Sequence, residues 1–384
     1  MINDLRYVFT PLSDSAGAIS RNTEYLLIET IRQVGVSNYS LIARLTGLSA
    51  ETVRYKVNKQ LSKLGLGILV NVDYAQLGFT MGMLVVTPDQ NAGKTWLDRT
   101  SYLILISKVM GQEKYLCLYA LPNRFKKKYM DSISELQKAG LVNEFESEEI
   151  SWIRYPPMRS EFFDLDSGRW KVDWKRVDTT QSEMGPTSHL INTDAKVDYI
   201  DTKILRYMQE DPTISPSKIA KNLGANARTI RYHYSEHVQK GKLILGNNVR
   251  WIKGQVPGRT PEVMQIGVLF RGLEPEELNV VRKLCNKIPF TLLEAAFENR
   301  GYFAFMDVPL EYFHETISYL DRYTSGLTTK KEMMILDPTK TQFLNVPDEL
   351  YDRERGWRLL QAPTPTATIE AESTAVENYV PPSG

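Results

Sequence analysis

The chain has 384 residues, which is more than a single domain of ordinary size holds. Its composition, 42% hydrophobic and 24% charged with two cysteines, excludes collagen-like, wholly disordered and disulfide-rich chains. The net charge of +1 favours no class of partner, so local clusters of charge have to be compared. No apolar run approaches the roughly 20 residues of a membrane span, and the early Asp4 argues against a secretory signal. We therefore expect a soluble, cytoplasmic protein that does not contact a membrane.

The first predicted unit follows an N-terminal extension, residues 1–22. Apolar residues at helical spacing predict a helix over 23–34, and a second short helix follows it. After a tight, glycine-containing turn, Ser49 is a good N-cap for a third helix. A β-rich segment over 67–72 then predicts a wing. Three helices with a sharp turn between the second and third, closed by a β wing, indicate a winged helix-turn-helix over 23–78.

Residues 79–155 alternate between strand and helix patterns. The expected strands and helices, in the order βαββαβ, lie at 81–86, 94–102, 104–110, 115–120, 123–138 and 142–153. This order is that of a ferredoxin-like domain. The polar segment 156–196 is expected to be a linker, partly ordered by Trp170 and Trp174.

The second half of the chain repeats the first. The tetrapeptide TVRY at 52–55 recurs as TIRY at 229–232, and the amphipathic segments before them share the same offset. The pattern predicts a winged helix-turn-helix over 197–256, with its wing strands at 243–246 and 249–252. Residues 257–337 are expected to form a ferredoxin-like domain, with elements at 264–270, 275–287, 292–297, 302–308, 310–323 and 327–336. An extension over 338–361 and a disordered tail over 362–384 follow. We therefore predict an α+β fold of two tandem units, each a winged helix-turn-helix followed by a βαββαβ ferredoxin-like domain.

This order of domains resembles the leucine-responsive regulator (Lrp/AsnC) family of bacterial and archaeal transcription factors. The segment 109–116, VMGQEKYL, is similar to the strand–glycine–polar–strand hairpin of that family's effector-binding domain. The resemblance implies a small-molecule effector near Gly111, Gln112 and Tyr115, and a homodimer formed through the ferredoxin-like domains. Two copies in one chain, with the additional segments 156–195 and 338–360, depart from the family pattern.

Basic residues gather on the two predicted recognition helices. Residues 38–65 contain five basic residues against one acidic residue, a net charge of +4, and residues 215–242 contain six against one, a net charge of +5. A helix of this kind fits the major groove of DNA, where outward side chains reach base edges and phosphates. The expected DNA contacts are Ser49, Thr52, Arg54, Tyr55, Asn58 and Lys59 in the first unit, and Asn226, Arg228, Thr229, Arg231, Tyr232 and Ser235 in the second.

Arg54 and Arg231 are the best candidates for bidentate contact with guanine or for holding a phosphate. For Tyr55 and Tyr232, DNA contact and packing against the preceding helix are equally open.

Two histidines have a spacing that suits a metal ion. His233 and His237 are four residues apart on one helix, but no third ligand is near them in the sequence. We therefore expect a DNA-facing or surface role for them and no metal site. Cys117 and Cys285 lack metal-ligand spacing and are expected in the core. No phosphate loop or nucleophile motif is present, so we expect neither an enzyme nor a cofactor.

These observations predict a sequence-specific transcription regulator that binds double-stranded DNA in the major groove with two recognition helices. Two alternatives remain open. One is a protein-interaction module without DNA binding. The other is an enzyme similar to siroheme decarboxylases, which share this architecture and would need a basic, histidine-containing pocket for a polycarboxylate.

Overall fold

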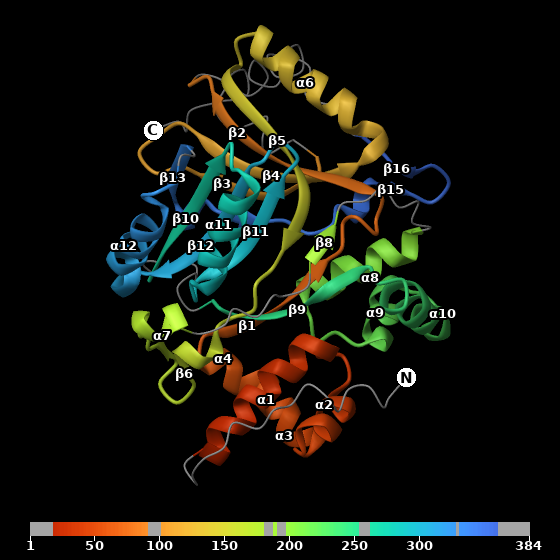
Figure 1. The fold of residues 1–384 in the computed structure, drawn as a ribbon. Coiled ribbons are helices and arrows are strands. Elements are labelled where there is room, and N and C mark those ends of the chain that lie inside the picture. The colour runs from red at the N-terminus through yellow and green to blue at the C-terminus, as the bar shows by residue number, and fades with distance from the viewer. Residues whose placement is uncertain are drawn as a thin grey trace, which may run out of the picture.

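The computed structural model describes residues 18–90, 101–179, 187–189, 197–252, 262–327 and 330–359. Two helical heads lie beside a large curved sheet, the first at the bottom and the second at the right of Figure 1. Helices and strands are mixed along the chain, so the α+β fold class is confirmed. The helix expected over 94–102 and the tail at 362–384 lie outside the described residues, apart from positions 101 and 102. In the described part of the chain, no helix combines the length and apolar character needed to span a membrane.

The first head has four helical segments: α1 (Ala18–Val34), α2 (Tyr39–Thr46), α3 (Ala50–Tyr55) and α4 (Leu61–Lys63), with the π-helical η2 (Lys56–Gln60) joining the last two. Gly47, with φ of +73°, ends α2 in the left-handed conformation that glycine adopts without a steric penalty. The side chain of Ser49 then accepts a hydrogen bond from the backbone N–H of Thr52 and begins α3. Ile31 and Val53 are buried in the core between these helices.

The second head is built in the same way. Its segments are α8 (Tyr199–Glu210), α9 (Pro216–Leu223), α10 (Ala227–Tyr232) and the π-helical η5 (His233–Gln239). Gly224 ends α9 with φ of +60°, and Asn226 caps α10. Ile230 and Val238 are buried against the rest of the head. Both predicted recognition helices, α3 and α10, therefore follow a capped, tight turn, and both continue into a π-helix.

The wings differ from the prediction. Each head contributes one strand, β1 (Leu66–Val72) or β9 (Ile244–Trp251), and these two strands pair with each other in an antiparallel register that places Leu66 opposite Trp251. The two short strands expected at 243–246 and 249–252 are thus one strand. A single strand leaves its backbone N–H and C=O groups without partners, and pairing across the heads satisfies them.

The large sheet has two halves with the same strand order. The first contains β2 (Phe79–Pro88), β3 (Leu103–Lys108), β4 (Tyr115–Pro122) and β5 (Val142–Arg154), with η3 (Asn123–Phe125) and α6 (Lys126–Lys138) between the last two. The second contains β10 (Val263–Arg271), α11 (Pro275–Lys287), β11 (Thr291–Phe297), β12 (Tyr302–Pro309), η7 (Leu310–Tyr312), α12 (Phe313–Thr324) and β13 (Lys330–Leu336). The strands run in the order β5-β2-β4-β3 and β13-β10-β12-β11.

The two halves join at both of their edges. On one side β11 pairs antiparallel with β5, where Ala295 lies opposite Ile153. On the other side the bridge Val109–Leu336 and a 2.8 Å hydrogen bond from Met110 N–H to the Ile335 carbonyl connect the end of β3 to β13. The sheet therefore closes on itself, with α6, α11 and α12 outside it (Figure 1).

A buried ion pair lies at the β5–β11 edge. The guanidinium of Arg154 donates from Nε to Glu294 Oε2 at 2.9 Å, and both side chains are almost fully buried. Burial raises the pKa of the Glu294 carboxyl, and the charge of Arg154 opposes this rise.

Short elements connect these parts. They are η4 (Ser160–Phe162), β6 (Phe163–Asp164), β7 (Arg169–Trp170), α7 (Trp174–Thr179), β8 (Thr187–His189), η8 (Pro338–Lys340), β14 (Gln342–Phe343), η9 (Asp348–Leu350), β15 (Tyr351–Asp352) and β16 (Gly356–Trp357). Their tryptophans anchor them: Trp170 is buried among aromatic rings that include Phe290, and Trp357 packs edge-on against Phe79. Cys117 and Cys285 are buried free thiols, as expected.

Candidate nucleic-acid interface

The first recognition helix presents most of its expected contact residues to solvent. Arg54, Tyr55, Asn58 and Lys59 are exposed, as is the N-cap residue Ser49. Thr52 is partly buried, and its hydroxyl lies 2.8 Å from Ser49 Oγ. The cap therefore occupies both hydroxyls, and the surface open to a ligand is formed mainly by the other four side chains.

Arg54 is held by an aromatic ring. Its guanidinium lies 5.7 Å from the centre of the Tyr39 ring, and the Tyr39 hydroxyl donates a 3.2 Å hydrogen bond to Asn58 Oδ1. Within the described chain no carboxylate forms an ion pair with Arg54. A cation–π contact orients the guanidinium without neutralising it, so its five N–H donors remain available to an anion.

One basic residue of this helix faces inward. Lys56 forms an ion pair with Glu24 of α1 and donates a 3.1 Å hydrogen bond to Gln60 Oε1. The net charge of +4 counted from the sequence therefore overstates the basic surface of the first head. The pairing was not visible in the sequence because the partners lie 32 residues apart, on different helices.

The predicted recognition helix of the second head, α10, also presents most of its expected contact residues to solvent. Asn226, Arg228, Thr229, Arg231 and Tyr232 are exposed. The Asn226 side chain accepts a 2.8 Å hydrogen bond from the backbone N–H of Arg228, and Arg231 Nη2 donates to Ser217 Oγ at 3.2 Å.

Ser235 differs from its neighbours on this helix. It is partly buried, and its hydroxyl donates to the Arg231 carbonyl at 2.9 Å. This side chain is therefore turned back onto its own helix.

The role expected for the two histidines needs correction. His233 is buried, with Nδ1 at 3.0 Å from Asp201 Oδ1, and His237 Nδ1 lies 3.1 Å from Asp201 Oδ2. The Nδ1 atoms of both rings thus face α8. His233 departs from the expected surface position, whereas His237 remains 31% exposed. Asp201 is 32 residues from His233 and 36 residues from His237 in the sequence. The search for a third ligand near the histidines therefore missed it. The one local signal was the Asp-x-x-Asp of Asp198 and Asp201, which forms a capping box.

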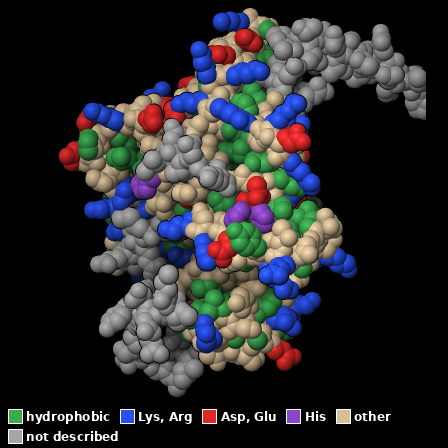
Figure 2. Space-filling model, turned by 90° about the vertical axis from the view of Figure 1, so that its right-hand side faces the viewer, with side chains coloured by type: hydrophobic (Ala, Val, Ile, Leu, Met, Phe, Trp, Pro, Cys, Tyr) green, Lys and Arg blue, Asp and Glu red, His purple; other side chains and the backbone are tan. Residues whose placement is uncertain are grey.

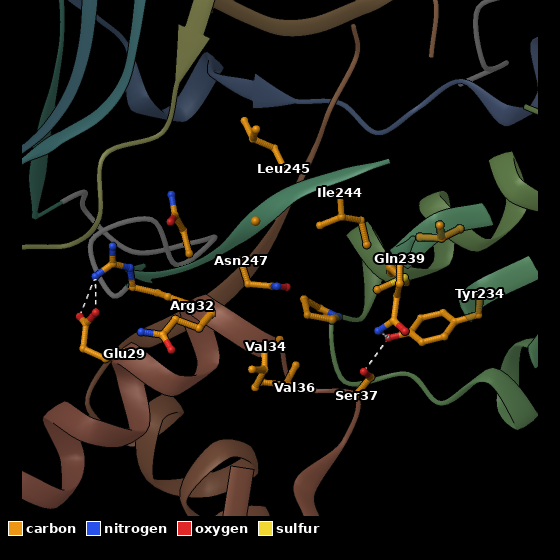
Figure 3. Close-up of a pocket in the computed structure, with 17 residues that line it drawn as sticks. Glu29, Arg32, Val34, Val36, Ser37, Tyr234, Gln239, Ile244, Leu245 and Asn247 are labelled. Carbon is orange, nitrogen blue, oxygen red and sulfur yellow. Dashed lines mark hydrogen bonds and ion pairs between the residues drawn. The ribbon is translucent and has the colours of Figure 1, made fainter. Parts of the chain in front are cut away.

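A cleft of about 750 Å³ separates the two heads (Figure 3). The end of α1 forms one wall, and η5 with the start of β9 forms the other. Figure 3 shows Tyr234 reaching across to Ser37, and this hydrogen bond from the Tyr234 hydroxyl to Ser37 Oγ measures 2.6 Å. Burial raises the pKa of the Tyr234 phenol, so it stays protonated and able to donate. The two heads are therefore connected by a side-chain hydrogen bond as well as by β1 and β9.

The residues expected to bind an effector lie at the turn between β3 and β4. Gly111, with φ of +71°, and Gln112 are exposed, whereas Tyr115 is buried in β4. The turn adjoins β13 at the closure of the sheet. Neither the cleft between the heads nor the cavity described next is lined by these three residues.

A smaller cavity of about 180 Å³ lies between the wing strands and the sheet. Among the described residues that line it, Arg250 is the one cation and Asp307 the one carboxylate, and most of the others are apolar. The guanidinium of Arg250 lies 5.5 Å from the centre of the Phe343 ring. Burial lowers the pKa of Arg250, and the charge of Asp307 opposes this effect.

Comparison with known proteins places a winged helix-turn-helix in the second half of the chain. Residues 197–242 match the family model described as winged helix-turn-helix DNA-binding. No curated protein sequence matches the chain closely enough to count as a relative.

Solved structures give a likeness over nearly the whole chain. The siroheme decarboxylase NirDL has a TM-score of 0.51 and 10% identity, covering 93% of this chain and 100% of its own. NirDL in complex with an iron-uroporphyrin III analogue gives the same TM-score and identity over 82% and 91%. AsnC of E. coli covers 36% of this chain and 93% of its own, with 16% identity and a TM-score of 0.25. With a TM-score of 0.25, the likeness to AsnC carries no argument, and at 10% identity the likeness to NirDL shows the fold alone.

This likeness contradicts the expectation that the chain is not an enzyme. Two solved structures that share its fold over most of its length are those of a siroheme decarboxylase. The lack of a phosphate loop or nucleophile motif therefore does not separate this chain from enzymes, since a fold can host unrelated functions.

Proposed function

We propose that the chain is a transcription regulator of Lrp/AsnC type, built as two tandem units whose recognition helices, α3 with η2 and α10 with η5, bind the major groove of double-stranded DNA. The observation that supports this most is the pair Arg54 and Arg231. They occupy matching places after matching turns, both are exposed, and neither has a carboxylate partner among the described residues. An exposed arginine at the start of a recognition helix can bind guanine or phosphate with two hydrogen bonds.

The match to winged helix-turn-helix DNA-binding domains adds independent support. It covers the second head, including Arg228 and Arg231. The first head has the same turn chemistry and the same exposed arginine, although the family model does not reach it.

The two heads would read different sequences. At the offset that relates Arg54 to Arg231, Asn58 and Lys59 correspond to Ser235 and Glu236. The carboxylate of Glu236 forms a 2.8 Å ion pair with Lys240 and would repel a phosphate, whereas Lys59 would attract one. We therefore expect an asymmetric operator.

Arg54→Ala and Arg231→Ala test the proposal. After selection of a binding site from genomic fragments, fluorescence anisotropy would measure the affinity of each variant at several salt concentrations. We expect each substitution to weaken binding by about 1–3 kcal/mol. This is a loss of roughly 5- to 150-fold. The slope of log affinity against log salt concentration should fall by about 1, as expected for the loss of one phosphate contact.

Arg322→Ala is the matched control, because Arg322 is an exposed helical arginine on α12, away from both heads. Unchanged affinity in both head variants, with no effect of salt, would refute the proposal. Wild-type protein that binds no fragment at low salt would instead favour the protein-interaction module.

The tetrapyrrole alternative has a separate test. A polycarboxylate needs several cations, and the described lining of the 180 Å³ cavity provides only Arg250. A siroheme-type ligand is titrated with the protein while its absorbance is recorded. A shift in absorbance with wild type that is lost with Arg250→Ala would support the enzyme in place of the regulator.

A further inference from the structure

Four potential metal ligands from two helices meet in the second head. Asp198 and Asp201 lie at the start of α8, and His233 and His237 lie on η5, directly after α10. One ligand atom from each of these side chains lies within 4.8 Å of every other. We propose that these residues bind a divalent transition-metal ion, which would join the first helix of the second head to its recognition helix. The proposal does not rest on DNA binding.

The distances are close to those of a coordination site. A tetrahedral ion with bonds of about 2.0–2.1 Å has ligand atoms about 3.4 Å apart. The His233 Nδ1 atom lies 3.0 Å from Asp201 Oδ1 and 3.4 Å from Asp198 Oδ2. The His237 Nδ1 atom lies 3.1 Å from Asp201 Oδ2 and 3.9 Å from Asp198 Oδ2. Only small side-chain movements would place these atoms around one ion.

The capping role of Asp198 does not use the oxygen that faces the histidines. Its Oδ1 accepts hydrogen bonds from the backbone N–H groups of Ile200 and Asp201, at 2.8 and 3.1 Å. Its Oδ2 faces the two imidazoles. The other half of the capping box, from the Asp198 backbone N–H to Asp201 Oδ2 at 3.1 Å, shares an oxygen with the contact to His237. The cap that Asp198 provides can therefore persist while its own Oδ2 binds an ion, and helix capping alone does not account for the histidines.

The first head shows that the fold does not need histidines at this place. At the same offset that relates Arg54 to Arg231, the residues matching Asp201, His233 and His237 are Glu24, Lys56 and Gln60. There Lys56 pairs with Glu24, and Gln60 donates to Glu24 Oε1 at 3.5 Å. A lysine–glutamate pair thus provides the same helix contact without metal ligands, and the second head carries a ligand set in its place.

The site is accessible from solvent. The side chain of Asp198 is 48% exposed and that of His237 is 31% exposed, whereas Asp201 is fully buried. Figure 2 shows histidine and acidic side chains side by side at the surface of this head. The rings of His233 and His237 are held 4.5 Å apart, and the Tyr232 ring contacts both. An ion could therefore enter past the exposed side chains of Asp198 and His237 and be held by the buried carboxylate of Asp201.

The ligand types indicate which ions would bind. Two imidazoles favour Zn²⁺, Co²⁺ or Ni²⁺ over Ca²⁺ and Mg²⁺, which prefer sites made of oxygen atoms. An imidazole binds a metal ion only through a nitrogen that carries no proton, so binding would weaken at low pH, where the imidazoles become protonated.

Isothermal titration of untagged, full-length protein with Zn²⁺ tests the proposal, with Co²⁺ as a spectroscopic probe. We expect one Zn²⁺ per chain and visible Co²⁺ absorption bands. His237→Gln and Asp198→Asn should each weaken Zn²⁺ binding by roughly 10- to 100-fold or more. Asparagine keeps the N-cap, and His237 is partly exposed, so both variants should fold, which circular dichroism checks.

The matched control is His314→Gln, because His314 is exposed on α12, outside the site. It should bind Zn²⁺ as wild type does. The melting temperature gives a second readout: at one Zn²⁺ concentration, it should rise in wild type and in the control, and rise less in the two site variants. The proposal is overturned if folded wild type binds no ion, or if His237→Gln and His314→Gln bind it alike.

Discussion

Single residues of the sheet are constrained by what lies across from them, and Gly82 in β2 is the clearest case. It pairs with Tyr119 of β4, whose buried ring covers the place where a side chain at position 82 would lie. Protein interiors are close-packed, so such a ring cannot move without displacing its own neighbours. The Tyr119 ring is also in contact with Tyr129 of α6, at a centroid distance of 5.6 Å.

Gly82→Ala should therefore destabilise the protein. We expect the free energy of unfolding in urea to fall by about 1–3 kcal/mol, the usual cost of adding a methyl group to a filled core. Gly326→Ala is the matched control, because no described atom lies within 4 Å of the added methyl group and its φ is not in the left-handed region. Equal stability of the two variants would mean that Tyr119 has room to move.

At the scale of elements, the sequence predicts what is encoded locally. The helix expected over 275–287 begins and ends at those residues in α11, since Pro275 suits a first turn and the apolar spacing is regular. The caps at Ser49 and Asn226 were likewise found from residue type. The pairing of β1 with β9 could not be predicted, because the strands are far apart in the chain and neither contains a signal for its partner.

The same limit applies to the candidate sites. Exposure of Arg54 and Arg231 follows from the apolar stripe on the opposite face of each helix, and the sequence predicted it. The inward turn of Lys56 and the meeting of His233 with Asp201 depend on how one helix packs on another. Packing of that kind is set by the whole head and not by a local pattern.

The β1–β9 pair gives a prediction at this scale. Leu69→Pro removes a backbone N–H from β1 opposite Asn248, and the proline ring is incompatible with a regular ladder. Hydrogen exchange should therefore show loss of amide protection in both strands, including residues of β9 that are distant in sequence. Leu69→Ala retains the donor and should leave β9 protected. If Leu69→Pro exposes β1 alone, the strands are held by contacts other than their mutual hydrogen bonds.

At the scale of the whole molecule, the two heads belong to one chain and are tied together. The β1–β9 ladder and the hydrogen bond from Tyr234 to Ser37 connect them, and both strands continue toward the closed sheet. A symmetric homodimer presents two identical heads, whereas here the heads differ at Asn58 and Ser235 and are linked covalently. Under the proposed function, such a chain would fix both the order and the spacing of the two half-sites that it binds.

Spacing of the half-sites therefore distinguishes tied heads from independent ones. Inserting about 5 bp, roughly half a helical turn, between the half-sites of a selected operator should reduce affinity to that of one head, because the second half-site then faces away. Inserting about 10 bp, a full turn, returns the second half-site to the original face of the DNA but moves it by roughly 34 Å along the helix axis. Heads joined by flexible linkers would regain most of their affinity at the full turn, because the linker supplies a high effective concentration.

Heads fixed by β1 and β9 cannot follow that displacement, so we expect both insertions to weaken binding to the same level, measured by fluorescence anisotropy with each operator. An operator with an inverted second half-site at the original spacing is the control that shows whether the second head reads the sequence of its half-site. The protein should bind this operator as weakly as it binds the operators with insertions. Tyr234→Phe, which removes the bond to Ser37 but leaves the ladder, should not rescue the 10 bp operator, since the strands alone hold the heads at one distance. Recovery of affinity at the full turn would show that the heads separate in solution.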